Sequence, residues 1–146
     1  GLVRLAIVRL PLRGFESLAT LEALQLLRLR SCPELTGLPP LDHLQRLAAI
    51  SLSGCSNLRS LDFLADHPTL RTVDLEGCRW IRSLDPLQSV EHLRQVNIRG
   101  CSGELDPSPL IERGVRVVTG SPAGLRAVSR LFSRLSPTRL SADRTG

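Results

Sequence analysis

The segment LAAISLSGC, residues 47–55, decides the fold of this chain because its pattern returns at a fixed interval. The same order of leucine-like residues and a final cysteine occurs as LQLLRLRSC at 24–32, LRTVDLEGC at 70–78 and LRQVNIRGC at 93–101. The four terminal cysteines are each 23 residues apart. A constant period of this length indicates structural repeats stacked side by side.

Each nine-residue unit has the alternation of a strand with one buried face and one solvated face. The apolar fourth and sixth places should point into a core, and the third, fifth and seventh places should face solvent. We therefore expect parallel strands near 4–7, 26–29, 49–52, 72–75, 95–98 and 115–118. The places predicted to be buried are occupied by Leu27, Ile50, Val73 and Val96, and by Leu29, Leu52, Leu75 and Ile98.

The segments between the units predict short return arcs. Apolar residues follow the first three cysteines at intervals of three, which suits a 3₁₀ helix or irregular chain, and prolines at 39–40, 68 and 86 exclude a long helix. After Cys101 the pattern decays, because Leu105 stands one place late. The expected fold class is α/β: a right-handed curved stack with parallel strands on the concave face and short 3₁₀ or irregular arcs on the convex face. Asp62 and Asp85 align in successive units, and residues 85–87, DPL, resemble a turn-forming element.

The repeats should fill residues 1–120, as five to six units of 22–23 residues that begin with a degenerate copy at 2–10. Ser121 and Pro122 then favour a helix start, and apolar residues at helical spacing predict an amphipathic helix over 121–136 that caps the stack. We expect residues 137–146 to be disordered. Because the first repeat has no cap, we expect the chain to be the carboxy-terminal part of a longer protein.

The net charge of +5 comes mostly from residues 121–146, which contain five arginines and one acid. Phe132 is the only aromatic residue among them, so nucleic-acid binding by base stacking is not expected. Arg126, Arg130 and Arg134 would form one stripe on the predicted helix, either an ordinary solvated face or a contact for an acidic partner. No apolar run reaches membrane-spanning length, and no signal peptide is recognisable, so we expect no membrane association.

The cysteines and histidines do not form a recognisable reactive site. Zinc sites use ligand pairs two to four residues apart, whereas Cys32, Cys55, Cys78 and Cys101 are spread along the stack with their side chains pointing the same way. We expect free, buried thiols at the turn after each strand. His43, His67 and His92 do not align in the repeat and are expected on the surface. With no nucleophile–base constellation and no phosphate-binding glycine loop, we expect no catalysis, cofactor or metal.

The polar face of the predicted strands is the candidate partner-binding surface. It is either an unremarkable solvated face or a polar groove for a protein. Trp80, on the turn after Cys78, is a further candidate for an exposed contact, although a single tryptophan can simply pack against its neighbours. The candidate contact residues are Arg28, Arg30, Ser51, Ser53, Asp74, Glu76, Asn97 and Arg99.

Residues 2–120 resemble leucine-rich-repeat proteins. The pattern L-x-x-L-x-L-x-G-C followed by x-x-L-x-S-L-x-x-L resembles repeats of plant NB-ARC immune receptors. Residues 84–87, LDPL, look like the internalin pattern, although internalins use Asn where this chain has Cys. Together with the arginine-rich composition, the sequence resembles the repeat region of actinobacterial NACHT-type NTPases.

That resemblance implies a protein-interaction module. It would be the ligand-sensing or autoinhibitory region of a larger cytoplasmic NLR-like switch in bacterial antiphage defence. The partner would be a protein ligand or an upstream domain, and any oligomerisation would be driven upstream. The ATPase would also lie outside this chain, because the sequence has no Walker A motif. The alternative is an internalin-like surface adhesion or effector repeat domain.

Overall fold

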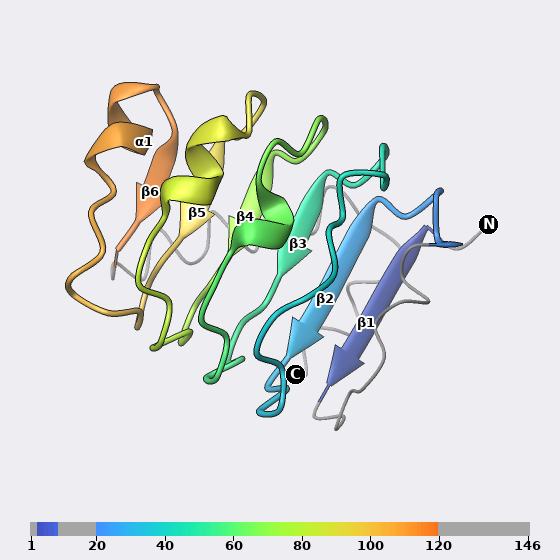
Figure 1. Ribbon diagram of the computed structural model, residues 1–146, viewed down its shortest axis with the longest axis horizontal. Coiled ribbons are helices and arrows are strands. Elements are labelled where there is room, and N and C mark those ends of the chain that lie inside the picture. Colours follow the sequence, from blue (N-terminus) through green and yellow to red (C-terminus); the bar gives the residue numbers. More distant parts are fainter. Residues whose placement is uncertain (1–2, 9–19, 120–146) are drawn as a thin grey trace.

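The chain forms an α/β structure built on one six-stranded, all-parallel sheet in which every strand lies beside the one before it (Figure 1). The structure is a computed structural model, and it describes residues 3–8 and 20–119. Within the described residues, short helices accompany the sheet. The strands are β1 (Arg4–Val8), β2 (Leu26–Arg30), β3 (Ala49–Ser51), β4 (Thr72–Asp74), β5 (Gln95–Asn97) and β6 (Arg116–Val118), and the helices are η2 (Asp62–Leu64), η3 (Asp85–Ser89) and α1 (Ser108–Glu112).

The register of the sheet reproduces the period of the sequence. Ile50 lies opposite Val73, and Val73 lies opposite Val96, so equivalent places of successive units are partners from β2 to β5. The offset is shorter at both ends of the sheet, where Arg4 pairs with Leu26 and Gln95 pairs with Arg116. The sheet therefore departs from its period only at its two ends, where the sequence pattern also degenerates.

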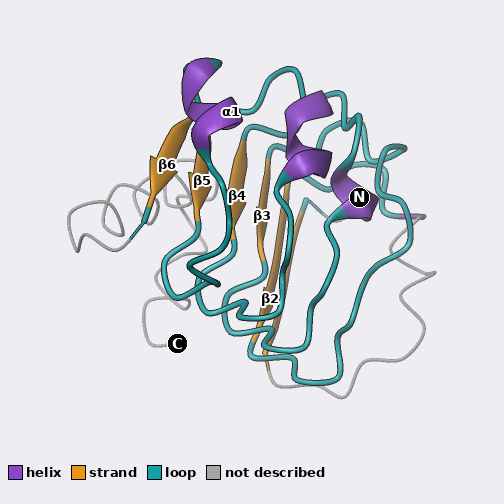
Figure 2. Ribbon diagram, turned by 60° about the vertical axis from the view of Figure 1, so that its left-hand side comes forward, coloured by secondary structure: helices purple, strands orange, loops and turns teal. Residues whose placement is uncertain are grey.

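The predicted core is confirmed. All eight fourth-place and sixth-place side chains of the four regular units are buried, and the leucine-like residues that follow each cysteine lie beside them. The return arcs that contribute these residues all lie on one side of the sheet (Figure 2). The opposite side of the sheet carries none of the described arcs.

The turns after β3, β4 and β5 depend on glycine, whereas Ser31 occupies the equivalent place after β2 with a φ angle of 52°. Gly54, Gly77 and Gly100 have φ angles of 75°, 77° and 74°, a left-handed conformation that strains other residues. Two of these turns direct an amide to the next unit: Gly54 N–H donates to the Glu76 carbonyl at 2.7 Å, and Gly77 N–H donates to the Arg99 carbonyl at 2.9 Å. The glycines also stack, since a Cβ added at Gly100 would lie 3.3 Å from the Gly77 nitrogen. The positive φ angle and the short distance between successive turns both favour glycine at these positions.

The arcs contain the predicted 3₁₀ turns. Asp62 and Asp85 begin η2 and η3, and their backbone amides donate to the hydroxyl oxygens of Ser60 and Ser83. The repeated Ser-x-Asp therefore starts both helices, which confirms the turn predicted at Asp85 and adds an equivalent one at Asp62.

Helix α1 was not anticipated from the sequence, which predicted only a decayed unit after Cys101. Arg113, directly after α1, fixes it to the neighbouring arc. Its Nη1 donates to the carbonyls of Leu87 (3.2 Å) and Gln88 (2.7 Å), and its Nη2 donates to the carbonyl of Val90 (2.7 Å). A guanidinium thus binds the carbonyl groups at the end of η3, a favourable place for a positive charge.

Three of the predictions concern residues 120–146, which lie outside the described part of the chain. These are the capping helix over 121–136, the tail 137–146 and the stripe of Arg126, Arg130 and Arg134. Among the residues that the structure does describe, no helix is long and apolar enough to cross a membrane.

Candidate functional site

A row of polar side chains crosses the middle of the sheet on the side without arcs. Ser51, Asp74 and Asn97 occupy directly opposed positions in β3, β4 and β5, and Arg28 extends the series onto β2. Opposed residues of adjacent strands point to the same face, so these four side chains are neighbours. We call Arg28, Ser51, Asp74 and Asn97 the polar row.

Asp74 is the centre of the polar row. Its Oδ2 accepts a hydrogen bond from Ser51 Oγ at 3.1 Å, and its Oδ1 accepts one from Asn97 Nδ2 at 3.0 Å. The backbone amide of Glu76 also donates to Oδ1, at 3.1 Å. Asn97 Oδ1 accepts the amide of Arg99 in the equivalent way, at 3.0 Å. Asp74 and Asn97 thus each bond both to a neighbouring strand and to the turn that follows their own strand.

The sequence predicted a solvated face here, and that prediction is wrong for the centre of the sheet. Ser51 and Asn97 are buried, and Asp74 is only 9% exposed. Their polar groups bond to one another across the strands, which replaces the water that the prediction assumed. The candidate contact residues that are half-buried are Arg28 and the one residue at the seventh place of each of the four units. We call Arg30, Ser53, Glu76 and Arg99 the seventh-place row.

Burial changes the protonation of Asp74. Desolvation raises the pKa of its carboxyl group, while the donors from Glu76 and Ser51 and the positive charge of Arg28 oppose that shift. The ionised form of Asp74 is therefore stabilised by these hydrogen-bond donors and not by water.

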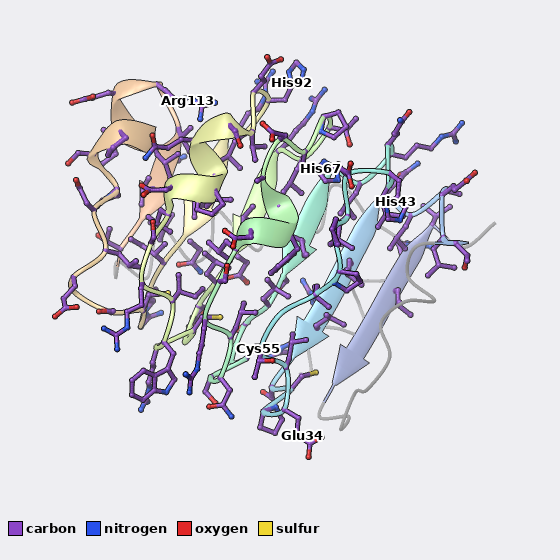
Figure 3. All side chains as sticks on the ribbon, viewed as in Figure 1. Glu34, His43, Cys55, His67, His92 and Arg113 are labelled. Carbon is purple, nitrogen blue, oxygen red and sulfur yellow. The ribbon has the colours of Figure 1, made fainter. Side chains whose placement is uncertain are left out.

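The four cysteines form a second column, at the turn that follows each strand. Cys55, Cys78 and Cys101 each donate from Sγ to the sixth-place carbonyl of the preceding unit, at 3.3, 3.1 and 3.0 Å. Figure 3 shows Cys55 close to the edge where the strands end. All four thiols are free, three of them are buried, and Cys101 is half-buried. The predicted place of the cysteines is confirmed, with Cys101 less enclosed than expected.

The thiols should be unreactive in the folded protein. Burial raises the pKa of Cys55 and of Cys101 to about 11, and raises that of Cys78 further. At pH 8 this lowers the reactive thiolate of Cys55 and Cys101 by about 100-fold relative to a thiol of pKa 9. Cys32 is fully buried, so a disulfide reagent should modify the native protein slowly, with the half-buried Cys101 first. In denaturant without reductant, four thiols should react at once. A count of two or none would contradict free cysteines.

His67 is buried, contrary to the expected surface position. It is 1% exposed, and its Nδ1 accepts the backbone amides of Thr69 (3.3 Å) and Leu70 (3.2 Å). The sequence did contain a signal for this burial. Counted from the cysteine of each unit, His67 has the same place as Leu44 and Val90, which are apolar and buried. His43 and His92 are exposed along the same edge of the sheet (Figure 3).

Burial of His67 predicts that stability falls in mild acid. Desolvation lowers its pKa from 6.5, while the Leu41 carbonyl and Asp42 oppose the shift and His43 adds to it. As pH falls through 6.5, the unfolded chain binds a proton that the folded chain resists, so the free energy of unfolding decreases. Protonation also removes the Nδ1 acceptor. Urea unfolding at pH 7.5 and 5.5 should show this loss in the wild type and a smaller one in His67→Leu. Equal losses would contradict the role of His67.

Trp80 is exposed, in agreement with one of the two interpretations of the sequence. Its side chain is 50% accessible, and the Arg82 guanidinium carbon lies 6.0 Å from the ring centroid. This distance is at the outer limit of a cation–π contact, so the pair contributes little to stability at a solvated site. An apolar ring held at the surface remains a candidate contact.

The described residues contain no group of three or more His, Cys, Asp or Glu side chains that could hold a metal ion. The two best-organised sets, the polar row and the thiol column, hold successive units together. No protein-family model matches this chain, and no curated protein matches it.

Proposed function

We propose that the chain is a leucine-rich-repeat solenoid that acts as a protein-interaction module and carries no catalytic activity. The carrying observation is the register of β2–β5, which places equivalent residues of successive units side by side on the face without described arcs and leaves the seventh-place row partly exposed. Repeat stacks present extended surfaces of this kind to protein partners.

The seventh-place row is the part of this surface best suited to a partner. Its members remain partly exposed, whereas Ser51, Asp74 and Asn97 are buried and use their polar groups on each other. Its charges alternate along the stack, with Arg30 and Arg99 at the outer positions and Glu76 between them. A partner with complementary charges would be aligned along the stack in one register.

The wider context follows from the family resemblance. We propose the ligand-sensing or autoinhibitory repeat region of a larger NLR-like NACHT NTPase in bacterial antiphage defence, with a protein ligand or an upstream domain as its partner. The four free thiols support a cytoplasmic location, because reduced cysteines are typical of that compartment.

The proposal can be tested by photo-crosslinking in the full-length gene product. A photoreactive amino acid at Ser53, in the seventh-place row, should form adducts with a protein ligand or with an upstream domain of the same chain. The matched control places the same group at Ser60, on an exposed arc. Adducts from both positions in equal yield, or from Ser60 alone, would contradict an interaction surface on this face.

A further inference from the structure

A groove of ≈540 Å³ lies at the opposite edge of the sheet, where the strands begin. Arg46, Arg71 and His92 contribute to its lining, together with the smaller side chains of Ala48 and Thr69. Figure 3 shows His92 at this edge, far from Cys55 at the edge where the strands end. The groove is therefore separate from the seventh-place row and does not depend on the proposed protein contact.

The groove exists because one unit has a small residue where its neighbours have long ones. The second place of each unit immediately precedes the strand, and it is occupied by Gln25, Ala48, Arg71 and Arg94 in succession. The register places Ala48 between Gln25 and Arg71. Thr69 is held beside it, because its Oγ1 donates to the Leu47 carbonyl at 2.8 Å. The short Ala48 side chain leaves space that the neighbouring long side chains surround.

The lining is positively charged without compensation. Arg46 and Arg71 are both exposed, and no acidic residue lines the groove. Neither guanidinium has an ion-pair partner within residues 3–8 and 20–119. The imidazole of His92 adds a further hydrogen-bond donor. Two unpaired guanidinium groups on one concave surface attract an anion with several oxygens, because each planar group can donate two parallel hydrogen bonds.

We propose that this groove binds the phosphate groups of a small phosphorylated ligand. Its volume falls within the range of small-molecule sites, about 300–1,000 Å³, and exceeds what a single inorganic phosphate fills. Arg46 and Arg71 would bind the phosphate oxygens, and Gln25 and Thr69 would offer polar contacts to the remainder of the ligand.

Inorganic pyrophosphate is a suitable probe, since it presents two linked phosphates without a variable organic part. Titrated into the ¹⁵N-labelled chain at constant ionic strength, it should produce saturable shifts of the amides of Ala48 and Arg71. Arg46→Gln and Arg71→Gln should each weaken binding by about tenfold, because each removes a charge-assisted contact. Ala48→Gln should abolish binding by filling the groove, with the amide shifts of β4 and β5 confirming that the fold is retained.

The matched control is Arg79→Gln, which removes the same charge from an exposed residue on the turn after β4, at the edge where the strands end and outside the groove. Its affinity should stay within about twofold of the wild type, since a distant exposed charge contributes little at moderate salt. No saturable shift in the wild type would overturn the proposal. Equal weakening by Arg79→Gln and Arg71→Gln, or unchanged binding in Ala48→Gln, would also overturn it, because either result would indicate general attraction to a basic surface.

Discussion

Leu75→Ala is expected to lower the free energy of unfolding by about 2–5 kcal/mol, a large fraction of the stability of a domain of this size. Leu75 is fully buried at the sixth place of its unit, directly after β4 and in the middle of the stack. The equivalent residues Leu52 and Ile98 precede and follow it in the same core. Because its neighbours are held by the sheet register, they cannot collapse into the cavity left by the missing methyl groups.

Urea unfolding followed by circular dichroism measures this change. The matched control is Ile111→Ala, since Ile111 is an aliphatic residue with more than half of its surface exposed, and its truncation should cost less than about 0.5 kcal/mol. Similar costs for the two variants would mean that the sixth place does not face the core, as a register shift of one residue would require.

Asp74→Ala is expected to destabilise the protein by about 2–4 kcal/mol, whereas Asp74→Asn should change the free energy of unfolding by less than about 1 kcal/mol. Alanine would leave Ser51 Oγ, Asn97 Nδ2 and the Glu76 amide without their acceptor in a buried place. Asparagine keeps one oxygen for two of these donors, and its amide group can donate to Ser51. It also removes a buried charge whose desolvation raises the pKa of Asp74.

The two Asp74 variants therefore separate hydrogen bonding from charge. Unfolding of the wild type and of both variants at pH 7 is sufficient, because neither alanine nor asparagine at this position titrates. If Asp74→Asn proved as damaging as Asp74→Ala, the negative charge itself would stabilise the fold, and pairing with Arg28 would matter more than the bonds to Ser51 and Asn97.

The strand register and the core could be predicted because both follow from one repeated pattern. The constant spacing of the units fixes which residues lie opposite each other, and alternation within each unit fixes which of them are buried. The glycine that precedes three of the cysteines is part of that pattern, and it marks the left-handed turn that starts each return arc.

The burial of the polar row could not be predicted from alternation, which treats every polar residue as solvated. Ser51, Asp74 and Asn97 become complementary donors and acceptors only when their opposition across the strands is known. His67 is a related case. Its place in the unit is apolar in the adjacent units, but imidazole can occupy it because two backbone amides bind its Nδ1. The hydrogen bonds from the Arg113 guanidinium could not be predicted either, because their carbonyl acceptors belong to the preceding arc.

Amide hydrogen exchange followed residue by residue by NMR tests the repeat register most directly. The amides of Leu52, Leu75 and Ile98 occupy equivalent places in successive units, and each donates to a carbonyl of the following strand, at 2.8, 2.8 and 2.9 Å. All three should be strongly protected, and the amides of Gly54 and Gly77, which bond to the next unit in the same way, should be protected with them. Exchange of Leu52, Leu75 and Ile98 at the rate of an unstructured peptide would contradict the stacked-repeat account.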